Sequence, residues 1–389
     1  MPEESRAFLA LHLAPVAATR AADDKEAMHS LRVVLLNSAG LVEYNRLVGA
    51  DVFGTDGLTD LDYAAKVQLI PTTPGDKKIF LIANEESITS VKGTGNNGSL
   101  TYLLNAFAAG DSGVEDSINS VYFTPDFTKN IVLSSSYKFN IGEEEKQHHE
   151  TFYLVHAATK FEFSFENLLE NEISIEELSV SSIADDMYLM AHFASPEEPE
   201  EKRVTWNDGN RARDEFWIDW LKEVSEDTTS NPDDPENESV NDKYGWIDDY
   251  LMPSGSTHQP RSIWSTSKEL PVSTLSSKVV TTLPIVYCPE SKNLRLDSQE
   301  EQEYQFSVRL KNGDEEKTFT RYLSHDNDID SSETSSTPGD AQNLRALFRN
   351  THVKVNVTIS RKAEEIELDL LIGVCPWYEP DAVDIPAFD

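Results

Sequence analysis

The sequence has few cysteines and few basic residues, and it contains no long apolar run. Its 389 residues include two cysteines, and 33 lysines and arginines stand against 69 aspartates and glutamates. The net charge of -36 repels phosphate groups, so we expect no nucleic-acid partner. No segment approaches the roughly 20 apolar residues that a membrane-spanning helix needs. The acidity itself is typical of a well-solvated surface.

Motifs that mark common catalytic and metal sites are also missing. The chain contains no Gly-x-Ser-x-Gly elbow, no phosphate-binding Gly-Lys-Ser/Thr loop and no His-Glu-x-x-His helix. The outer two of His148, His149 and His156 would lie about 25 Å apart along an extended strand. The acidic segment 326–330 lacks the glycine and the glutamate of a calcium loop. The sequence therefore predicts no enzyme, no cofactor and no metal ion.

The two cysteines share a similar context. Cys288 and Cys375 each precede a proline at the end of an apolar, strand-like run. These matching contexts leave a disulfide open in an oxidising compartment. We favour two buried free thiols in neighbouring strands.

Alternation of apolar and polar residues is the main structural signal. The odd positions from 353 to 359 are valine or isoleucine and the even positions are polar, which predicts a half-buried strand. A polar connection over 361–365 leads to a second strand from residue 366. Further strands are expected at 31–37, 78–84 and 160–166. A helical spacing over 100–109, ending before Gly110, predicts a short helix.

The length exceeds the usual size of one domain, so we expect two domains with separate cores. Many short strands with turns between them favour a mainly β fold of two sandwiches, with one or two short helices. We place the domains at 21–165 and 166–377. The second contains a loop-rich insertion, 195–260, that has few alternating apolar residues.

The hairpin predicted at the end of the second domain carries a family resemblance. Arg349-Asn350-x-His352 leads into the strand 353–359, and the last strand ends in Pro376-Trp377. This pattern resembles the C-terminal hairpin of the Bacteroidales fimbrillins, the type V pilins. The resemblance implies two transthyretin-like, Greek-key sandwiches in a fimbrial subunit that supports cell adhesion. It also implies export through the outer membrane to the cell surface as a lipoprotein precursor. The acylated cysteine of such a precursor is absent here, and residues 1–5 do not form a signal peptide, so we expect the sequence to begin after the leader.

The same resemblance suggests that the two ends of the chain take part in strand exchange. Leu9, Leu11 and Leu13 share one face of a first strand within a removable segment, 1–20. The resemblance implies that an Arg-specific protease cuts between Arg20 and Ala21. The tail 378–389 would then act as the donor strand of another copy. The donor residues would be Val383, Ile385 and Ala387. Without the resemblance, an ordinary first strand, a loop and a frayed terminus would be the simpler interpretation.

Tryptophans interleaved with aspartate and asparagine are concentrated in the insertion. Stacking on sugar rings is one role for such residues, whereas anchoring a long loop to a sandwich is the other and the one we favour. The candidate glycan contacts are Trp206, Trp217, Trp220 and Trp246. The expected partners are other copies of this chain, related fimbrial subunits, the protease, and a host glycan or protein. The candidate cleavage site and the tail favour a polymerising stalk subunit of the fimbria. The alternatives are a fimbrial tip or accessory adhesin and a secreted glycan-binding protein.

Overall fold

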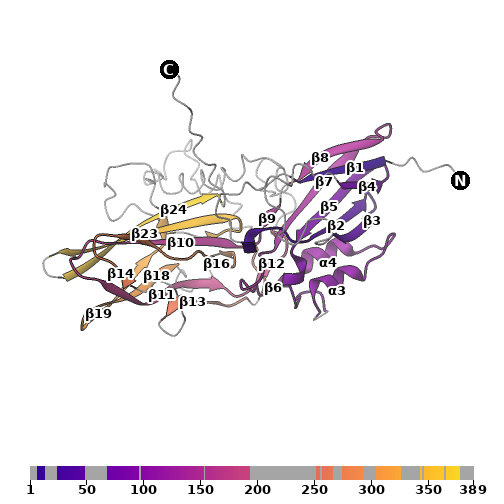
Figure 1. The fold of residues 1–389 in the computed structure, drawn as a ribbon. Coiled ribbons are helices and arrows are strands. Elements are labelled where there is room, and N and C mark those ends of the chain that lie inside the picture. Colours follow the sequence, from indigo (N-terminus) through magenta and orange to yellow (C-terminus); the bar gives the residue numbers. More distant parts are fainter. Residues whose placement is uncertain are drawn as a thin grey trace, which may run out of the picture. The chain divides into compact units, whose positions relative to one another are not determined.

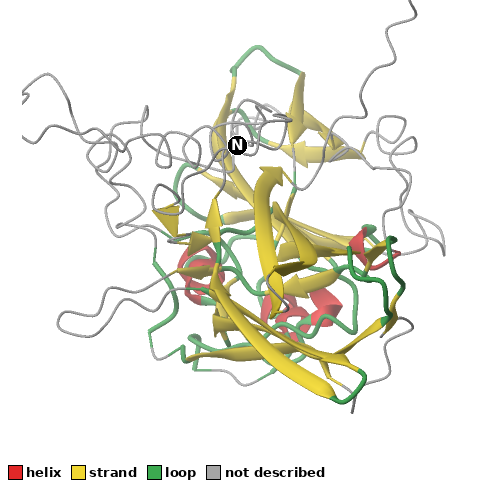
Figure 2. Cartoon of the chain, turned by 90° about the vertical axis from the view of Figure 1, so that its left-hand side faces the viewer, coloured by secondary structure: helices red, strands yellow, loops and turns green. Residues whose placement is uncertain are grey.

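The computed structural model confirms a mainly β fold (Figures 1 and 2). It describes residues 7–13, 24–48, 68–95, 98–152, 154–192, 251–254, 256–265, 274–292, 304–325, 342–343, 346–362 and 365–376. The chain divides into two compact units. Of the described residues, the first unit contains those up to Ala157 together with 186–192, and the second contains 158–185 and those from 251 onward. A boundary drawn after residue 165 would fall inside a strand of the second unit, β10 (Thr159–Asn167).

The first unit is built on a five-stranded antiparallel sheet in the order β3-β2-β5-β7-β9. Its strands are β2 (Leu31–Asn37), β3 (Val42–Val48), β5 (Gly75–Ala83), β7 (Leu133–Ile141) and β9 (Val155–His156). All residues from Leu31 to Leu36 are buried, including Arg32. Both faces of the sheet are covered, and this explains why the central strands read as apolar runs rather than as an alternation.

A smaller sheet covers one face of the larger one. It contains β1 (Ala7–Leu13), β4 (Gln68–Thr72) and β8 (Gln147–Phe152), in the order β4-β1-β8. The core between the two sheets includes Leu9, Leu35, Leu81 and Phe152. This arrangement makes the first unit a β-sandwich.

Short helices cover the opposite face of the large sheet. They are α3 (Leu100–Asn105) and α4 (Val114–Ser120), and their apolar residues pack with Val34, Phe80 and Ile82. The short strands β6 (Tyr122–Phe123) and β12 (Met187–Tyr188) and the 3-10 helices η1 (Asp24–Glu26) and η2 (Glu85–Ser87) complete the unit. The predicted helix over 100–109 is correct at its start, where the Ser99 hydroxyl accepts from the Tyr102 amide at 3.2 Å, but ends four residues early.

The second unit is a sandwich of two five-stranded sheets. One has the order β15-β10-β23-β24 with β16 also paired to β10, and the other has the order β13-β11-β18-β19 with β14 also paired to β11. The strands of the first sheet besides β10 are β15 (Val280–Thr282), β16 (Val286–Cys288), β23 (Thr351–Lys362) and β24 (Glu365–Pro376). The second sheet contains β11 (Ile173–Ala184), β13 (His258–Ser265), β14 (Thr274–Leu275), β18 (Gln305–Asn312) and β19 (Glu315–Tyr322).

Alternation predicted the central strands of the second unit correctly. On β23 the four residues Val353, Val355, Val357 and Ile359 are buried, while the residues between them are half-buried or exposed. The aromatic residues of β10 are buried in the same way, and Phe163 stacks on Phe306 of the other sheet, with ring centroids 6.0 Å apart. Two further strand pairs are β17 (Ser291–Lys292) with β22 (Ala346–Leu347), and β20 (Ser324–His325) with β21 (Gln342–Asn343).

The sheet order separates the two cysteines. Cys288 lies on β16 and Cys375 on β24, and β10 and β23 run between these two strands, so the prediction of neighbouring strands is wrong. Three spacings between strands amount to about 14 Å, whereas a disulfide needs Cα atoms within about 7 Å. Cys288 is a free, buried thiol, and burial raises its pKa to about 11. The Cys288 thiol is therefore a packing group rather than a nucleophile.

Candidate site of strand exchange

The first strand lies in the middle of the smaller sheet of the first unit (Figure 1). β1 runs antiparallel to β4, with Ala7 opposite Thr72 and Leu11 opposite Gln68. On its other side it runs parallel to β8, with Phe8 opposite Gln147. Its backbone is therefore paired on both edges, although it is the first of the described elements.

The inward side chains of β1 fill the core between the two sheets. Leu9 and Leu11 are 0% and 2% exposed, and they pack with residues of both sheets, whereas Phe8 on the outer face is 42% exposed. Burying a leucine side chain contributes about 1.5–3 kcal/mol. Leu9 and Leu11 therefore hold β1 in its place, as their positions on one strand face predicted.

We expect Leu11→Ala to reduce the free energy of unfolding of the first unit by about 2–5 kcal/mol, because it leaves a cavity in a closed core. Urea denaturation, with hydrogen exchange of the β4 and β8 amides, measures this. The matched control is Leu69→Ala on β4, because Leu69 is 54% exposed on the outer face. We expect it to cost less than about 1 kcal/mol. Equal effects of the two changes would contradict the role of Leu11 as an anchor.

Loss of β1 would also leave the strands on its two sides, β4 and β8, without their sheet partner. Among the described strands, β4 and β8 have no sheet partner except β1. Its removal would leave two facing rows of unpaired amides and carbonyls above an apolar cavity. Such a cavity accepts an extended segment that supplies backbone hydrogen bonds on both edges and apolar side chains at alternate positions.

A buried polar cluster fixes the end of β4 beside this site. The Lys77 ammonium donates to a Glu43 carboxylate oxygen and to the Thr73 hydroxyl, both at 2.9 Å. The Thr72 hydroxyl donates to the other Glu43 oxygen at 2.5 Å, and the Thr73 hydroxyl also donates to Glu43. Lys77 belongs to β5 and Glu43 to β3, so these bonds attach the end of β4 to the large sheet independently of β1.

Two opposing effects act on the pKa of the Glu43 carboxyl. Partial burial raises it, but hydrogen bonds from Lys77, Thr72 and Thr73 outweigh the burial, and the pKa lies below its ordinary value of 4.5. Because the folded-state pKa is lowered, the stabilisation is complete above pH 4.5 and is lost as the pH falls through the folded-state value.

We therefore expect the stability difference between the wild type and Glu43→Gln to be present at pH 7 and to shrink below pH 4.5. Urea denaturation of both proteins from pH 7 to pH 3 measures the difference. Glu144→Gln, at an exposed position of the same unit, is the control. A difference that is constant over this pH range would show that the ionised carboxylate does not carry the effect.

Several predicted site residues lie outside the described part of the chain. These are Arg20 and Ala21, the donor residues Val383, Ile385 and Ala387, and the tryptophans Trp206, Trp217, Trp220 and Trp246. The backbone of Leu13 is the end of β1, but its side chain is not described. The cleavage, donor and glycan assignments therefore stay predictions. Arg20 falls in the connection 14–23 between β1 and η1, so a cut there would leave β1 attached only by noncovalent contacts.

The Arg349-Asn350 motif stabilises the fold of the second unit. Arg349 is buried, and its Nε donates to a carboxylate oxygen of Glu290 at 2.8 Å. Asn350 has a φ of 61°, and its amide donates to the Ala158 carbonyl at 2.8 Å. The Asn350 bond joins the start of β23 to the start of β10, and the Arg349 bond joins it to the connection between β16 and β17. The first unit contains a similar buried pair, Arg32 with Glu85, at 2.7 Å. The sequence indicates neither glutamate, because each lies far along the chain from its arginine.

The described residues were also considered as a metal site and as a membrane span, and they fit neither. In these parts of the chain, no group of three or more histidine, cysteine, aspartate or glutamate side chains is arranged to hold a metal ion. None of the helices described is long and apolar enough to cross a membrane.

Comparison with solved structures places this fold among fimbrial proteins of Bacteroidales. The tip fimbrial protein Mfa3 from Porphyromonas gingivalis matches with a TM-score of 0.51 and 10% identity, covering 96% of this chain and all of that one. A fimbrial assembly protein from Parabacteroides distasonis has a TM-score of 0.43 and 11% identity, with 95% and 98% covered. The anchor protein Mfa2 from Porphyromonas gingivalis has a TM-score of 0.37 and 11% identity, with 96% and 100% covered.

At these identities the similarity shows the fold alone. The evidence for the shared fold is the match to Mfa3, whose TM-score is above 0.5. No protein-family model matches the chain, and no curated protein matches it in sequence. The predicted resemblance to type V pilins is confirmed in the fold of the chain.

Proposed function

We propose that this chain is a structural subunit of a cell-surface fimbria that polymerises when a protease releases its first strand. It would be exported as a lipoprotein precursor and cut after Arg20 by an Arg-specific protease. The tail of another copy would then occupy the place of β1. Its partners are copies of itself and related fimbrial subunits, and the assembled fimbria would support adhesion.

The central position of β1 carries this proposal. β1 is the first strand that the structure describes, it is held by Leu9 and Leu11, and it pairs on both edges. The tail repeats its pattern, because Val383, Ile385 and Ala387 stand at alternate positions as Leu9 and Leu11 do. Pro386 lacks an amide hydrogen, which is tolerated near the end of a strand. A tail of this pattern is able to supply both the backbone bonds and the apolar contacts of β1.

Limited cleavage tests the proposal directly. Purified full-length chain is treated with an Arg-specific protease and compared with untreated chain by electron microscopy and by SDS gels run with and without heating. We expect filaments and heat-labile ladders only after loss of the segment that ends at Arg20. A chain that is cut at Arg20, loses β1 and stays monomeric would contradict polymerisation by strand exchange.

A tip or accessory adhesin is the second candidate, and the fold similarity to a tip fimbrial protein favours it. A tip subunit has no need to donate a strand, so its tail would be dispensable. If the cleaved chain accepts a tail from a fimbrial subunit but never donates its own, the tip assignment replaces the stalk assignment.

A further inference from the structure

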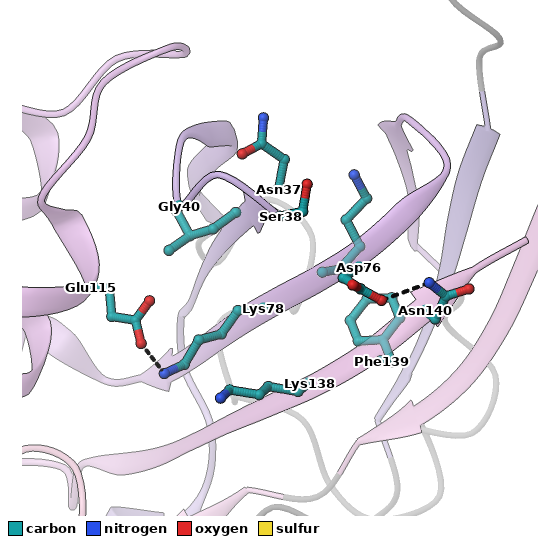
Figure 3. Close-up of a pocket in the computed structure, with 11 residues that line it drawn as sticks. Asn37, Ser38, Gly40, Asp76, Lys78, Glu115, Lys138, Phe139 and Asn140 are labelled. Atoms are coloured by element: carbon teal, nitrogen blue, oxygen red, sulfur yellow. Dashed lines mark hydrogen bonds and ion pairs between the residues drawn. The ribbon is translucent and has the colours of Figure 1, made fainter. Parts of the chain in front are cut away.

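A pocket of about 550 Å³ opens on the helix-covered face of the first unit's large sheet, beside the first turn of α4. Figure 3 shows the residues that line it. The turn after β2, the start of β5 and the end of β7 line it, and α4 contributes Glu115. The volume lies within the range of small-molecule sites. No part of this pocket belongs to β1, β4 or β8.

Two lysines face each other across the strands that line the pocket. Lys78 of β5 is directly opposite Lys138 of β7 in the antiparallel register, and Figure 3 shows both side chains extending in the same direction. Like charges in this arrangement destabilise a sheet. Lys78 is neutralised by an ion pair with Glu115. Lys138 is exposed, and among the described residues it has no ion pair. Lys138 is therefore the cation of the lining with which an anionic group of a ligand is able to pair.

Acceptors and further donors lie beside that cation. Asn140 donates its amide to one Asp76 oxygen at 2.7 Å, which leaves the other Asp76 oxygen and the Asn140 carbonyl as acceptors. The Asn37 side-chain oxygen accepts from the amides of Ala39 and Leu41, both at 3.0 Å, and this holds its amino group as a donor. Asp76 and Lys78 are two residues apart on one strand face, so their Cα atoms lie about 7 Å apart.

We propose that this pocket binds an acidic sugar residue, such as a uronic or sialic acid. Lys138 would pair with the carboxylate, and Asp76 and Asn140 would accept from hydroxyl groups. The CH groups of the sugar would contact the aliphatic part of Lys78. This assignment is independent of strand exchange and of the tryptophans in the insertion.

The charges of the lining favour a sugar with one carboxylate over an acidic peptide. Asp76 and Glu115 would repel a second or third carboxylate close to the first, whereas hydroxyl groups satisfy Asp76. A single sugar in an open pocket binds weakly, with a dissociation constant on the order of 1 mM. Repetition of the pocket on neighbouring copies would raise the avidity for a polyvalent glycan.

Saturation-transfer NMR and titration of the full chain test the assignment. The probes are glucuronic acid, N-acetylneuraminic acid, glucose and a tetraglutamate peptide. We expect millimolar binding of at least one acidic sugar and at least tenfold weaker binding of glucose and the peptide. Lys138→Ala and Asp76→Ala should each weaken binding of the acidic sugar at least fivefold. Lys138→Ala also removes the facing like charge, so the variant should remain folded.

Lys129→Ala is the matched control, because Lys129 is a partly exposed lysine of the same unit outside the pocket and pairs with Asp126 at 3.6 Å. It should bind as the wild type does. The assignment is overturned if neither acidic sugar binds, if glucose or the peptide binds equally well, or if Lys138→Ala keeps the wild-type affinity.

Discussion

Arg20→Gln is expected to keep the chain monomeric after treatment with an Arg-specific protease, under conditions in which the wild type forms filaments. While the 14–23 connection is intact, β1 stays tethered beside its own site at an effective concentration on the order of millimolar. The tail of a second copy at micromolar concentration cannot compete with it. Cleavage removes the tether, and β1 is then lost by dilution.

Electron microscopy and N-terminal sequencing of the product measure this effect, because a cut after Arg20 yields an N-terminal Ala21. The control is Arg6→Gln, since Arg6 directly precedes β1 and a cut there leaves the strand attached. Filaments from Arg20→Gln with an intact 1–20 segment would contradict the requirement for strand release.

Val383→Asp combined with Ile385→Asp is expected to abolish filament growth from cleaved subunits. Each residue would contribute about 1.5–3 kcal/mol on burial, and each aspartate would instead bring a charge into the apolar core between the two sheets. The result should be monomers that have lost β1, as seen by SDS gels and electron microscopy.

The variant retains its own site, which separates a donor defect from a folding defect. When mixed with cleaved wild type, it should accept a wild-type tail and then end the filament, so filaments become shorter as its share rises. Asp384→Asn is the control, because residue 384 lies on the other face of the tail strand and should leave growth unchanged. Normal growth of the double variant alone would remove the tail from the mechanism.

Local periodicity predicted individual strands well, because a half-buried strand reveals its two faces in consecutive residues. β23 and β10 are examples, and both have the predicted apolar face buried. Their parallel pairing was not predictable from either segment. Thr159 lies opposite Thr351, and only the closure of the sheet brings such distant residues together.

The polar residues of the candidate site were the hardest to anticipate. Glu43, Thr72 and Lys77 come from three strands, and no local pattern marks a lysine that will be buried beside a glutamate. Lys78 and Lys138 likewise become neighbours only through the register of β5 and β7. Burial and charge pairing depend on the positions of segments far apart in the chain, which propensity and periodicity do not describe.

By itself the sequence determined the β class, the acidity, the strand faces of β1, β10 and β23, and the resemblance to type V pilins. Those features depend on composition and on residues adjacent in the chain. Only the tertiary structure decided that β1 pairs on both edges, that two strands lie between those that carry the cysteines, and that two lysines meet at one pocket. Sheet order and register decide these contacts, and both are set by how the apolar faces of distant strands pack together.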